Sequence, residues 1–282
     1  MSNPFYQPPP PLLNSPALQA AYAIIESQIG VGKAALLLHG SLTIGVDDPH
    51  ADIDLWVLSD DASVEAFEQA AGTRFIQFHS PREGHFQIQS IDAFRRRMAA
   101  CDFELISELR HAQVVRDYDD EGRRLLEEAR KPMSDEVRFA WFRYHYVEMR
   151  SEHRACDNSV ERCNAPALLM CASRTIQHAL QAAMILDREP YRYSKWLMRM
   201  AERSGPTGVK VVPLVNDAIW LISAGALLDP GPEREHRLSM KLREIRNVLI
   251  DSARGEGIDG PSLTDWYLHI DKARGGVHDV RW

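Results

Sequence analysis

"LLLHGSLTIGVDDPHADIDLWVL", residues 36–58, holds two apolar runs that are joined by a polar loop. The first run, Ala34–His39, is short and apolar, which is typical of a buried β-strand. The second, Asp52–Leu58, alternates before it becomes fully apolar, so it is predicted to be a strand as well. With a period of two, Asp52 and Asp54 share one face of this strand, whereas the aliphatic residues between and after them face the core.

The residues at the ends of these two strands predict a site for a metal-bound phosphate. Gly40 lets a phosphate approach the main chain, and the Ser41 hydroxyl with successive N–H groups can hold its oxygens. Asp52 and Asp54 repel each other unless a cation lies between them, and Mg²⁺ prefers such oxygen ligands. A metal held there would bridge the phosphates of a nucleoside triphosphate and neutralise charge on the leaving pyrophosphate. The alternative is a polar turn between two strands, in which Asp52 only caps the loop.

Alternating patterns continue after this stretch and predict a small mixed sheet with helices. Arg74–His79 and His85–Ile91 both alternate, and a helix at about Val64–Ala71 separates the second strand from the third. His111–Val115 is a candidate for one last short strand. From Ile91 onward almost all other segments have helical periodicity.

The predicted fold class is α+β, with a small mixed β-sheet domain followed by an all-α helical bundle. Residues 1–14 are proline-rich and are expected to form a flexible arm, followed by a helix at Ala17–Ile29. The domain boundary is placed at Lys131–Pro132, which gives domains 1–131 and 132–282. Helices expected in the second domain are 136–155, capped by Ser134, then 167–187, 194–203, 213–224, 232–252 and 262–274.

Composition excludes several classes of protein. The net charge of −7 argues against a broad phosphate-binding surface and hence against a nucleic-acid partner. No run reaches the ~18 apolar residues that span a bilayer, and no secretion signal is evident, so a cytoplasmic protein without membrane contact is expected. The four cysteines form no metal-binding pattern and are expected to be reduced thiols.

The order Gly-Ser, ten residues, then Asp-x-Asp on a strand resembles the signature of the DNA polymerase β-type nucleotidyltransferase superfamily. Within this superfamily, the sequence resembles the aminoglycoside and lincosamide nucleotidyltransferases, which confer antibiotic resistance. This resemblance implies Mg²⁺-dependent transfer of a nucleotide, usually AMP from ATP, to a hydroxyl of a small-molecule acceptor, in a cleft between two domains. It makes Asp52 and Asp54 catalytic metal ligands, and Gly40 and Ser41 nucleotide contacts. Whether a second protomer forms a homodimer and completes the cleft is left open.

The resemblance also implies a third carboxylate on a neighbouring strand. That position is expected at Gln87, or at Gln89 if the register slips, and neither side chain can ionise. Glu83 and Asp92 flank the strand and could substitute only if its ends bend inward. Either the third ligand is dispensable, or the domain binds nucleotide without efficient transfer.

A general base is expected on the first long helix of the C-terminal domain, as in the kanamycin-modifying relatives. Glu148 is the first choice because its aromatic and apolar neighbours in sequence would bury it and raise its pKa. Glu152 lies one turn further on. The alternative is that both carboxylates are solvated and paired with Arg150, Arg154 or neighbouring helices.

Lys195 is a second candidate in the C-terminal domain, for a contact with the β- or γ-phosphate of the nucleotide. The alternative is that Trp196 is a core residue and Lys195 extends beside it. Three other functions are kept open: a helical nuclease using Arg174 and His178, a nucleotide-binding pseudoenzyme, and a toxin-like nucleotidyltransferase acting on a protein or tRNA.

Overall fold

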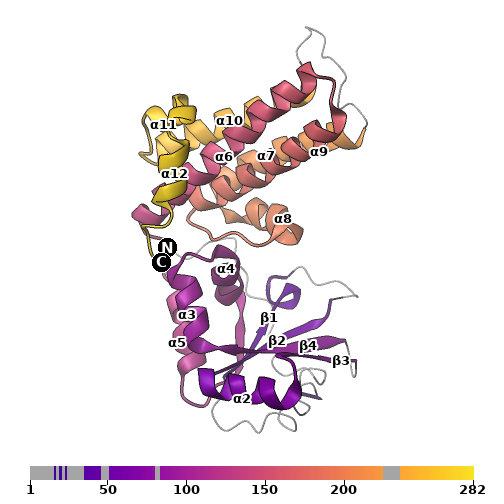
Figure 1. Cartoon of the computed structure of the whole chain (residues 1–282), viewed down its shortest axis with the longest axis vertical. Helices are drawn as coiled ribbons and strands as arrows, with labels where there is room; N and C mark the ends of the chain where they lie inside the picture. The colour runs from indigo at the N-terminus through magenta and orange to yellow at the C-terminus, as the bar shows by residue number, and fades with distance from the viewer. Residues whose placement is uncertain are drawn as a thin grey trace. The chain divides into compact units, whose positions relative to one another are not determined.

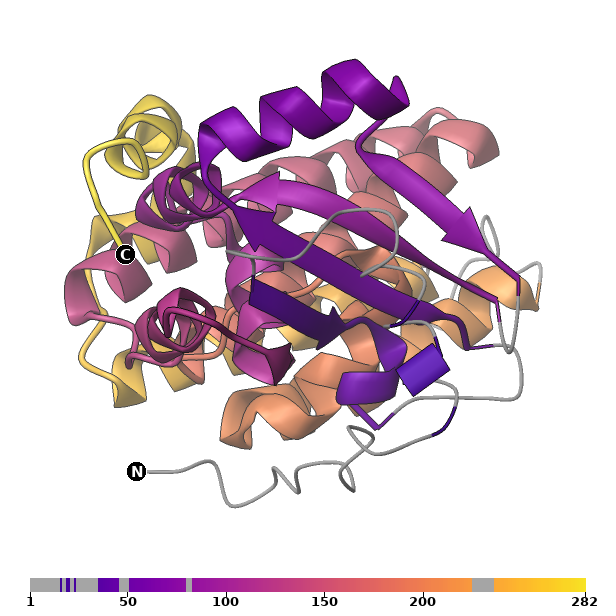
Figure 2. The ribbon, with the colours of Figure 1, turned by 90° about the horizontal axis from the view of Figure 1, so that it is seen from below.

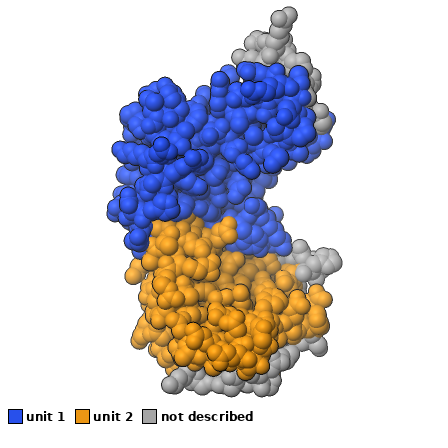
Figure 3. Space-filling view, viewed as in Figure 1, with its two compact units in different colours: residues 1–5, 132–282 blue, residues 6–131 orange. Residues whose placement is uncertain are grey.

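The computed structural model describes residues 35–45, 51–79, 83–224 and 236–282, together with Pro16, Gln19, Ala20 and Ala23. The predicted proline-rich arm and most of the predicted helix at 17–29 lie outside the described residues. The chain divides into two compact units between Lys131 and Pro132 (Figure 3). One contains a mixed sheet with helices and the other is all-α, so the predicted α+β class is confirmed.

The first unit contains a five-stranded sheet in the order β3-β4-β2-β1-β5. Figure 2 shows the strands side by side in this order. Strands β2 and β4 are parallel, and the other neighbours are antiparallel. All four predicted strands and the candidate fifth are present, with bounds β1 Ala35–His39, β2 Ile53–Ser59, β3 Phe75–Phe78, β4 Gly84–Ser90 and β5 Gln113–Arg116.

Helices of the first unit begin at polar caps and are labelled in Figure 1. The predicted helix at Val64–Ala71 begins earlier, because Asp60 accepts a hydrogen bond from the Ser63 N–H and caps its start. Ser90 and Asp102 cap the next two helices in the same way. The bounds are α2 Asp61–Ala71, α3 Ile91–Ala99, α4 Phe103–His111 and α5 Glu121–Ala129.

The two faces of the sheet have different partners. Leu55 and Val57 of β2 lie in a buried cluster with Val64 of α2, so α2 packs on that face. On the opposite face, Phe94 of α3 contacts the Trp56 ring edge-on, with 4.9 Å between the ring centroids. Side chains on both sides of β2 are therefore buried along most of the strand, and its N-terminal end is where polar side chains are placed.

The second unit is helical throughout the part that the structure describes. Its longest helix is capped at Ser134, as predicted, but runs on to Glu161. The helix expected from Pro213 begins at Pro206, since Asp187 accepts hydrogen bonds from the free N–H groups of Thr207 and Gly208. The bounds are α6 Asp135–Glu161, α7 Ala165–Leu186, α8 Ser194–Ser204, α9 Pro206–Ser223 and α10 Arg237–Gly255.

The prediction of one continuous helix at 262–274 is wrong. The segment forms two short helices, α11 Pro261–Thr264 and α12 Ile270–Gly276, with the 3₁₀-helix η3 Trp266–Leu268 between them. Exposed apolar side chains in η3, such as Leu268, explain why periodicity alone suggested one continuous helix.

Among the described residues, no helix has both the length and the apolar character that crossing a membrane requires. All four cysteines are free thiols: Cys101 and Cys156 are buried, and Cys163 is exposed.

Candidate metal and phosphate site

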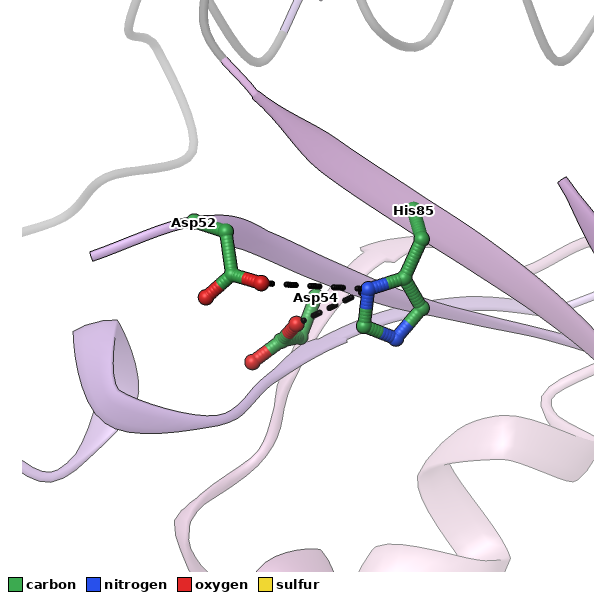
Figure 4. Close-up of side chains that lie close together, drawn as sticks. All are labelled: Asp52, Asp54 and His85. Atoms are coloured by element: carbon green, nitrogen blue, oxygen red, sulfur yellow. Dashed lines mark ion pairs between the residues drawn. The ribbon is translucent and has the colours of Figure 1, made fainter. Parts of the chain in front are cut away.

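Three side chains that can bind a metal ion converge at the N-terminal end of β2 (Figure 4). Asp52 immediately precedes the strand, Asp54 is its second residue, and His85 is the second residue of β4. Nδ1 of His85 lies 3.2 Å from Oδ1 of Asp54 and 4.0 Å from Oδ2 of Asp52. One ligand atom from each residue lies within 4.8 Å of the other two. A single divalent ion could therefore contact all three.

The register between β2 and β4 brings His85 to this place. The two strands are parallel, with Ile53 paired to Gly84 and Asp54 paired to His85. The pairing depends on Gly84: a Cβ atom there would lie 2.6 Å from the Ile53 carbonyl oxygen. Because that oxygen belongs to the backbone, a side chain at this position would push the start of the two strands apart.

Gly40 places the turn after β1 directly against Asp54. Its φ of 82° and ψ of −157° lie in a region that essentially only glycine adopts. A Cβ atom at Gly40 would lie 2.0 Å from Oδ2 of Asp54. Ser41 begins the 3₁₀-helix η2 (Ser41–Thr43), and the Thr43 hydroxyl donates to the Gly40 carbonyl at 3.0 Å. The predicted juxtaposition of Gly40 and Ser41 with the acidic strand is therefore present, while residues 46–50 of the loop lie outside the described residues.

Aromatic packing closes one side of the site. The His39 ring stacks on Trp56 with 3.7 Å between centroids, and its Nδ1 lies 3.5 Å from Glu108. Since His39 is paired with Asp54 across the two strands, this stack begins directly beside the carboxylate.

The three candidate ligands differ in exposure and charge. The Asp52 side chain is 52% exposed, whereas that of Asp54 is 16% exposed. Burial lowers the pKa of His85 below its ordinary value of 6.5, and the Asp52 carboxylate only partly offsets this effect. The imidazole is therefore neutral at pH 7, which is the form that binds metals.

His85, and not the expected Gln87, is the residue of β4 that lies beside Asp52 and Asp54. The expected third position, Gln87, is paired with Trp56, one step further along the same face, and Gln89 is paired with Leu58. Glu83 lies near His79 rather than in the cluster, with 3.8 Å between the charged atoms. The sequence contains one signal that could have identified His85: it begins the alternating "HFQIQ" pattern, as Asp52 begins "DIDLW".

Glu148 lies in the second unit and forms an ion pair there. Nε of Arg274 donates to its Oε1 at 2.5 Å, and a second guanidinium nitrogen donates to Oε2 at 3.1 Å. Its side chain is only 14% exposed, so burial was expected correctly, but the partner is neither Arg150 nor Arg154. The contact fits the alternative interpretation, in which Glu148 is a paired structural carboxylate. Its assignment as a general base stays a prediction.

Lys195 is exposed at the start of α8 in the second unit. Its Nζ lies 4.9 Å from the centre of the Trp196 ring, and the indole N–H donates to the Tyr193 hydroxyl at 3.0 Å. Trp196 is partly buried, whereas the alternative interpretation made it a core residue. A role for Lys195 in nucleotide binding stays a prediction.

Arg174 and His178 lie on α7 and contact side chains of α6. Arg174 contacts Glu152 at 3.3 Å, and Nδ1 of His178 lies 3.1 Å from Nδ1 of His145. His145 in turn contacts the buried Tyr191 hydroxyl at 3.1 Å. These contacts explain both residues as packing and hydrogen-bonding partners, with no need for a nuclease.

Comparison with known proteins gives only distant similarity, and it is to solved structures. No family model matches the sequence, and no curated protein matches it. Among solved structures, a nucleotidyltransferase-like protein from Exiguobacterium sibiricum 255-15 is similar over 85% of this chain and 76% of its own, with a TM-score of 0.48 and 12% identity. A similarity this distant does not decide the activity, which has to be inferred from the geometry of the site.

Substitution of Gly40 by alanine should displace Asp54 and weaken binding of a divalent ion. The new Cβ atom would overlap the Asp54 carboxylate, so the affinity for Mn²⁺ should fall about tenfold or more. Gly45→Ala is the matched control, because Gly45 also has a positive φ of 65° but open space around its Cβ position. Titration calorimetry with both metal-free variants measures the difference. Equal losses in the two variants would refute the role of the close approach.

Acid should destabilise the second unit through His145 and His178. Burial lowers the pKa of both, and that of His145 falls well below 6.5. The unfolded chain binds a proton on each near pH 6.5 while the native chain does not, so this stability is complete above pH 6.5. As the pH falls from 6.5 toward the native pKa values, the free energy of unfolding should drop by about 1.4 kcal/mol per pH unit for each histidine.

Urea unfolding between pH 8 and 5 tests this. The His178→Gln variant should show a shallower slope, whereas His278→Gln, which changes an exposed histidine of the same unit, should keep the slope of the parent protein. A His178 midpoint near 7 in an NMR titration would contradict the prediction, and it would revive the nuclease hypothesis.

Proposed function

We propose that the protein is a metal-dependent nucleotidyltransferase that transfers AMP from ATP to a hydroxyl group of a small-molecule acceptor. The observation that supports this most is the convergence of Asp52, Asp54 and His85 beside the Gly40 turn. A metal site at the end of a strand, beside a turn with a hydroxyl and N–H groups, supplies the two kinds of group that the reaction needs together. The chemical type of the acceptor, aminoglycoside-like or lincosamide-like, rests on the sequence resemblance alone.

The residues present fit a divalent cation, with Mg²⁺ as the proposed ion. Two carboxylates and a neutral imidazole offer three ligand atoms within 4.8 Å of one another, and the half-exposed Asp52 leaves the site open to solvent and substrate. When bound, the cation supplies positive charge that offsets the charge of the triphosphate. Asp52, Asp54 and His85 would hold it.

The turn and the strand have separate tasks in this proposal. Gly40 lets the turn lie against the Asp54 carboxylate, and the Ser41 hydroxyl would donate to a phosphate oxygen. Asp54 is fixed by its contact with Gly40 and its neighbour His85, whereas Asp52 is freer to adjust. This division gives one rigid and one adaptable carboxylate at the same site.

The reaction exchanges one phosphorus–oxygen bond for another. The acceptor hydroxyl oxygen forms a bond to the α-phosphorus of ATP while the bond to the bridging oxygen breaks, and pyrophosphate leaves. The hydroxyl proton passes to a base, for which Glu148 remains the candidate. Lys195 is the candidate for a contact with the β- or γ-phosphate.

Nucleotide binding without turnover is the second candidate function. It is favoured by the imidazole at the third position, because Mg²⁺ prefers carboxylate and water oxygens to nitrogen ligands. The two candidates share the metal site and differ only in whether pyrophosphate is released. Measuring binding and release on the same preparation therefore separates them.

Pyrophosphate release from labelled ATP, with Mg²⁺ and a panel of aminoglycosides and lincosamides, tests the proposal. The Asp54→Asn variant keeps the shape of the side chain but loses its charge, and it should reduce release by about 100-fold or more, because it removes a direct ligand. His85→Ala should reduce it at least tenfold at limiting metal. Gln87→Ala is the matched control on the same strand face and should leave release within about twofold of the parent rate.

Three results would decide between the candidates. Release that survives Asp54→Asn would refute the mechanism. Saturable ATP binding with no release for any acceptor would support the nucleotide-binding protein instead. A larger effect of Gln87→Ala than of His85→Ala would show that the third position had been assigned to the wrong residue.

Glu148 and Arg274 allow a separate test of the base. If Glu148 accepts the proton, Glu148→Gln should lower the turnover number at least tenfold while the affinity for ATP changes little. If the ion pair is only structural, Glu148→Gln and Arg274→Gln should lower the free energy of unfolding by similar amounts, each about 1 kcal/mol. The turnover number of the folded enzyme should then be the same in the two variants. Steady-state kinetics and urea unfolding of both variants provide the comparison.

A further inference from the structure

A second charged cavity lies within the helical unit. It has a volume of about 440 Å³ and is lined by side chains of α6, α10 and η3, all of them in the part of the chain after Pro132. Four arginines contribute to its wall: Arg150 and Arg154 from α6, and Arg243 and Arg246 from α10. This arginine pocket shares no residue with the cluster at β2.

The charge of the arginine pocket is opposite to that of the chain. The protein carries a net charge of −7, yet the pocket lining has four guanidinium groups and a single carboxylate, Asp157. Oδ1 of Asp157 also lies 4.0 Å from Nε2 of His153. Among the residues that line the cavity, positive charges therefore outnumber negative ones, which favours an anionic ligand.

Bringing these groups together costs free energy in the empty protein. Burial lowers the pKa of Arg246, and the nearby guanidinium groups of Arg150 and Arg243 lower it further. Nε of Arg150 is buried and has no hydrogen-bond acceptor in the described structure. Burial also lowers the pKa of His153 to about 4, so it adds no charge of its own at pH 7. An anion in the cavity would offset both costs.

Two other arginines of the second unit, Arg138 and Arg188, form ion pairs with carboxylates. Arg138 pairs with Glu256 at 2.6 Å and Arg188 with Asp135 at 2.6 Å. In the pocket, by contrast, Arg246 donates to the neutral side-chain oxygen of Asn247. Arg246 thus differs from Arg138 and Arg188 in having a neutral hydrogen-bond acceptor.

Aromatic rings complete the wall of the pocket. Trp266 and Tyr267 of η3 both line it, and the Arg150 guanidinium lies over the Trp266 ring at 5.7 Å. Tyr267 is 58% exposed, which leaves its ring available for a planar group. The volume falls within the range of small-molecule sites, about 300 to 1,000 Å³.

We propose that the arginine pocket is a binding site for a nucleoside polyphosphate, separate from the metal site. Guanidinium groups match phosphate oxygens in geometry and charge, and four of them suit a ligand with two or more phosphates. The base would lie against Tyr267. The site does not depend on Asp52, Asp54 or a metal ion.

Titration calorimetry on the full chain with EDTA present tests the proposal, with ATP, inorganic pyrophosphate and adenosine as probes. The Arg154→Gln/Arg243→Gln variant changes two exposed arginines of the pocket, and Arg162→Gln/Arg237→Gln makes the same charge change elsewhere on or beside the same helices. We expect ATP affinity to fall at least tenfold in the first variant and less than twofold in the second. ATP should bind more tightly than pyrophosphate, and adenosine should not bind detectably.

Several outcomes would overturn the proposal. Absence of saturable ATP binding would do so, as would equal losses in the two double variants. If ATP binding is abolished by Asp52→Asn/Asp54→Asn but not by the pocket variant, the nucleotide occupies the metal site and the pocket assignment fails while the proposed function stands. Tighter binding of a single-stranded RNA than of ATP, dependent on the same arginines, would replace the small ligand by a nucleic acid.

Discussion

The close approach of the Gly40 backbone to the Asp54 carboxylate is the constraint on which the candidate site depends. A side chain at residue 40 would occupy the space of Oδ2, and the backbone there has a conformation available essentially only to glycine. Because β1 and β2 are antiparallel neighbours, this contact fixes the turn after one strand against the first residues of the next. The Ser41 hydroxyl, successive N–H groups and two carboxylates are therefore brought close together by residues of neighbouring strands. Gly84 allows the parallel strand β4, which carries His85, to pair closely with β2.

Charged side chains are arranged differently in the two compact units. In the sheet unit, acidic side chains gather at one strand end, and a neutral histidine rather than a lysine or arginine lies between them. In the helical unit, Arg138 and Arg188 pair with carboxylates, whereas four arginines and one carboxylate line the arginine pocket. Clusters of like charge are costly in a folded chain unless a ligand of opposite charge offsets them. Both clusters therefore mark places where a ligand would stabilise the protein.

Periodicity predicted most of the fold because the deciding signals are local. The strands around Asp54, the Ser134 cap and the mixed sheet all follow from patterns within ten residues. Pairs that are distant in sequence could not be predicted: Glu148 meets Arg274 across 126 positions, and nothing near either residue indicates the contact. The position of His85 was missed for a related reason, since the register of two parallel strands is set by tertiary packing at Gly84 and not by the alternation of either strand. At residues 261–276 a continuous helical pattern predicted one helix, whereas the structure has two short helices and a 3₁₀-helix between them.

The neutral imidazole of His85 changes the electrostatics of any complex formed at the strand end. Two carboxylates and one uncharged ligand balance a divalent ion, so the occupied centre carries no formal charge, whereas three carboxylates would leave it at −1. An incoming triphosphate bears several negative charges, and its approach to a neutral centre meets no long-range repulsion from the ligand set. With histidine in place of a third carboxylate, a bound divalent ion would therefore be held less strongly, and the occupied centre would repel an incoming triphosphate less.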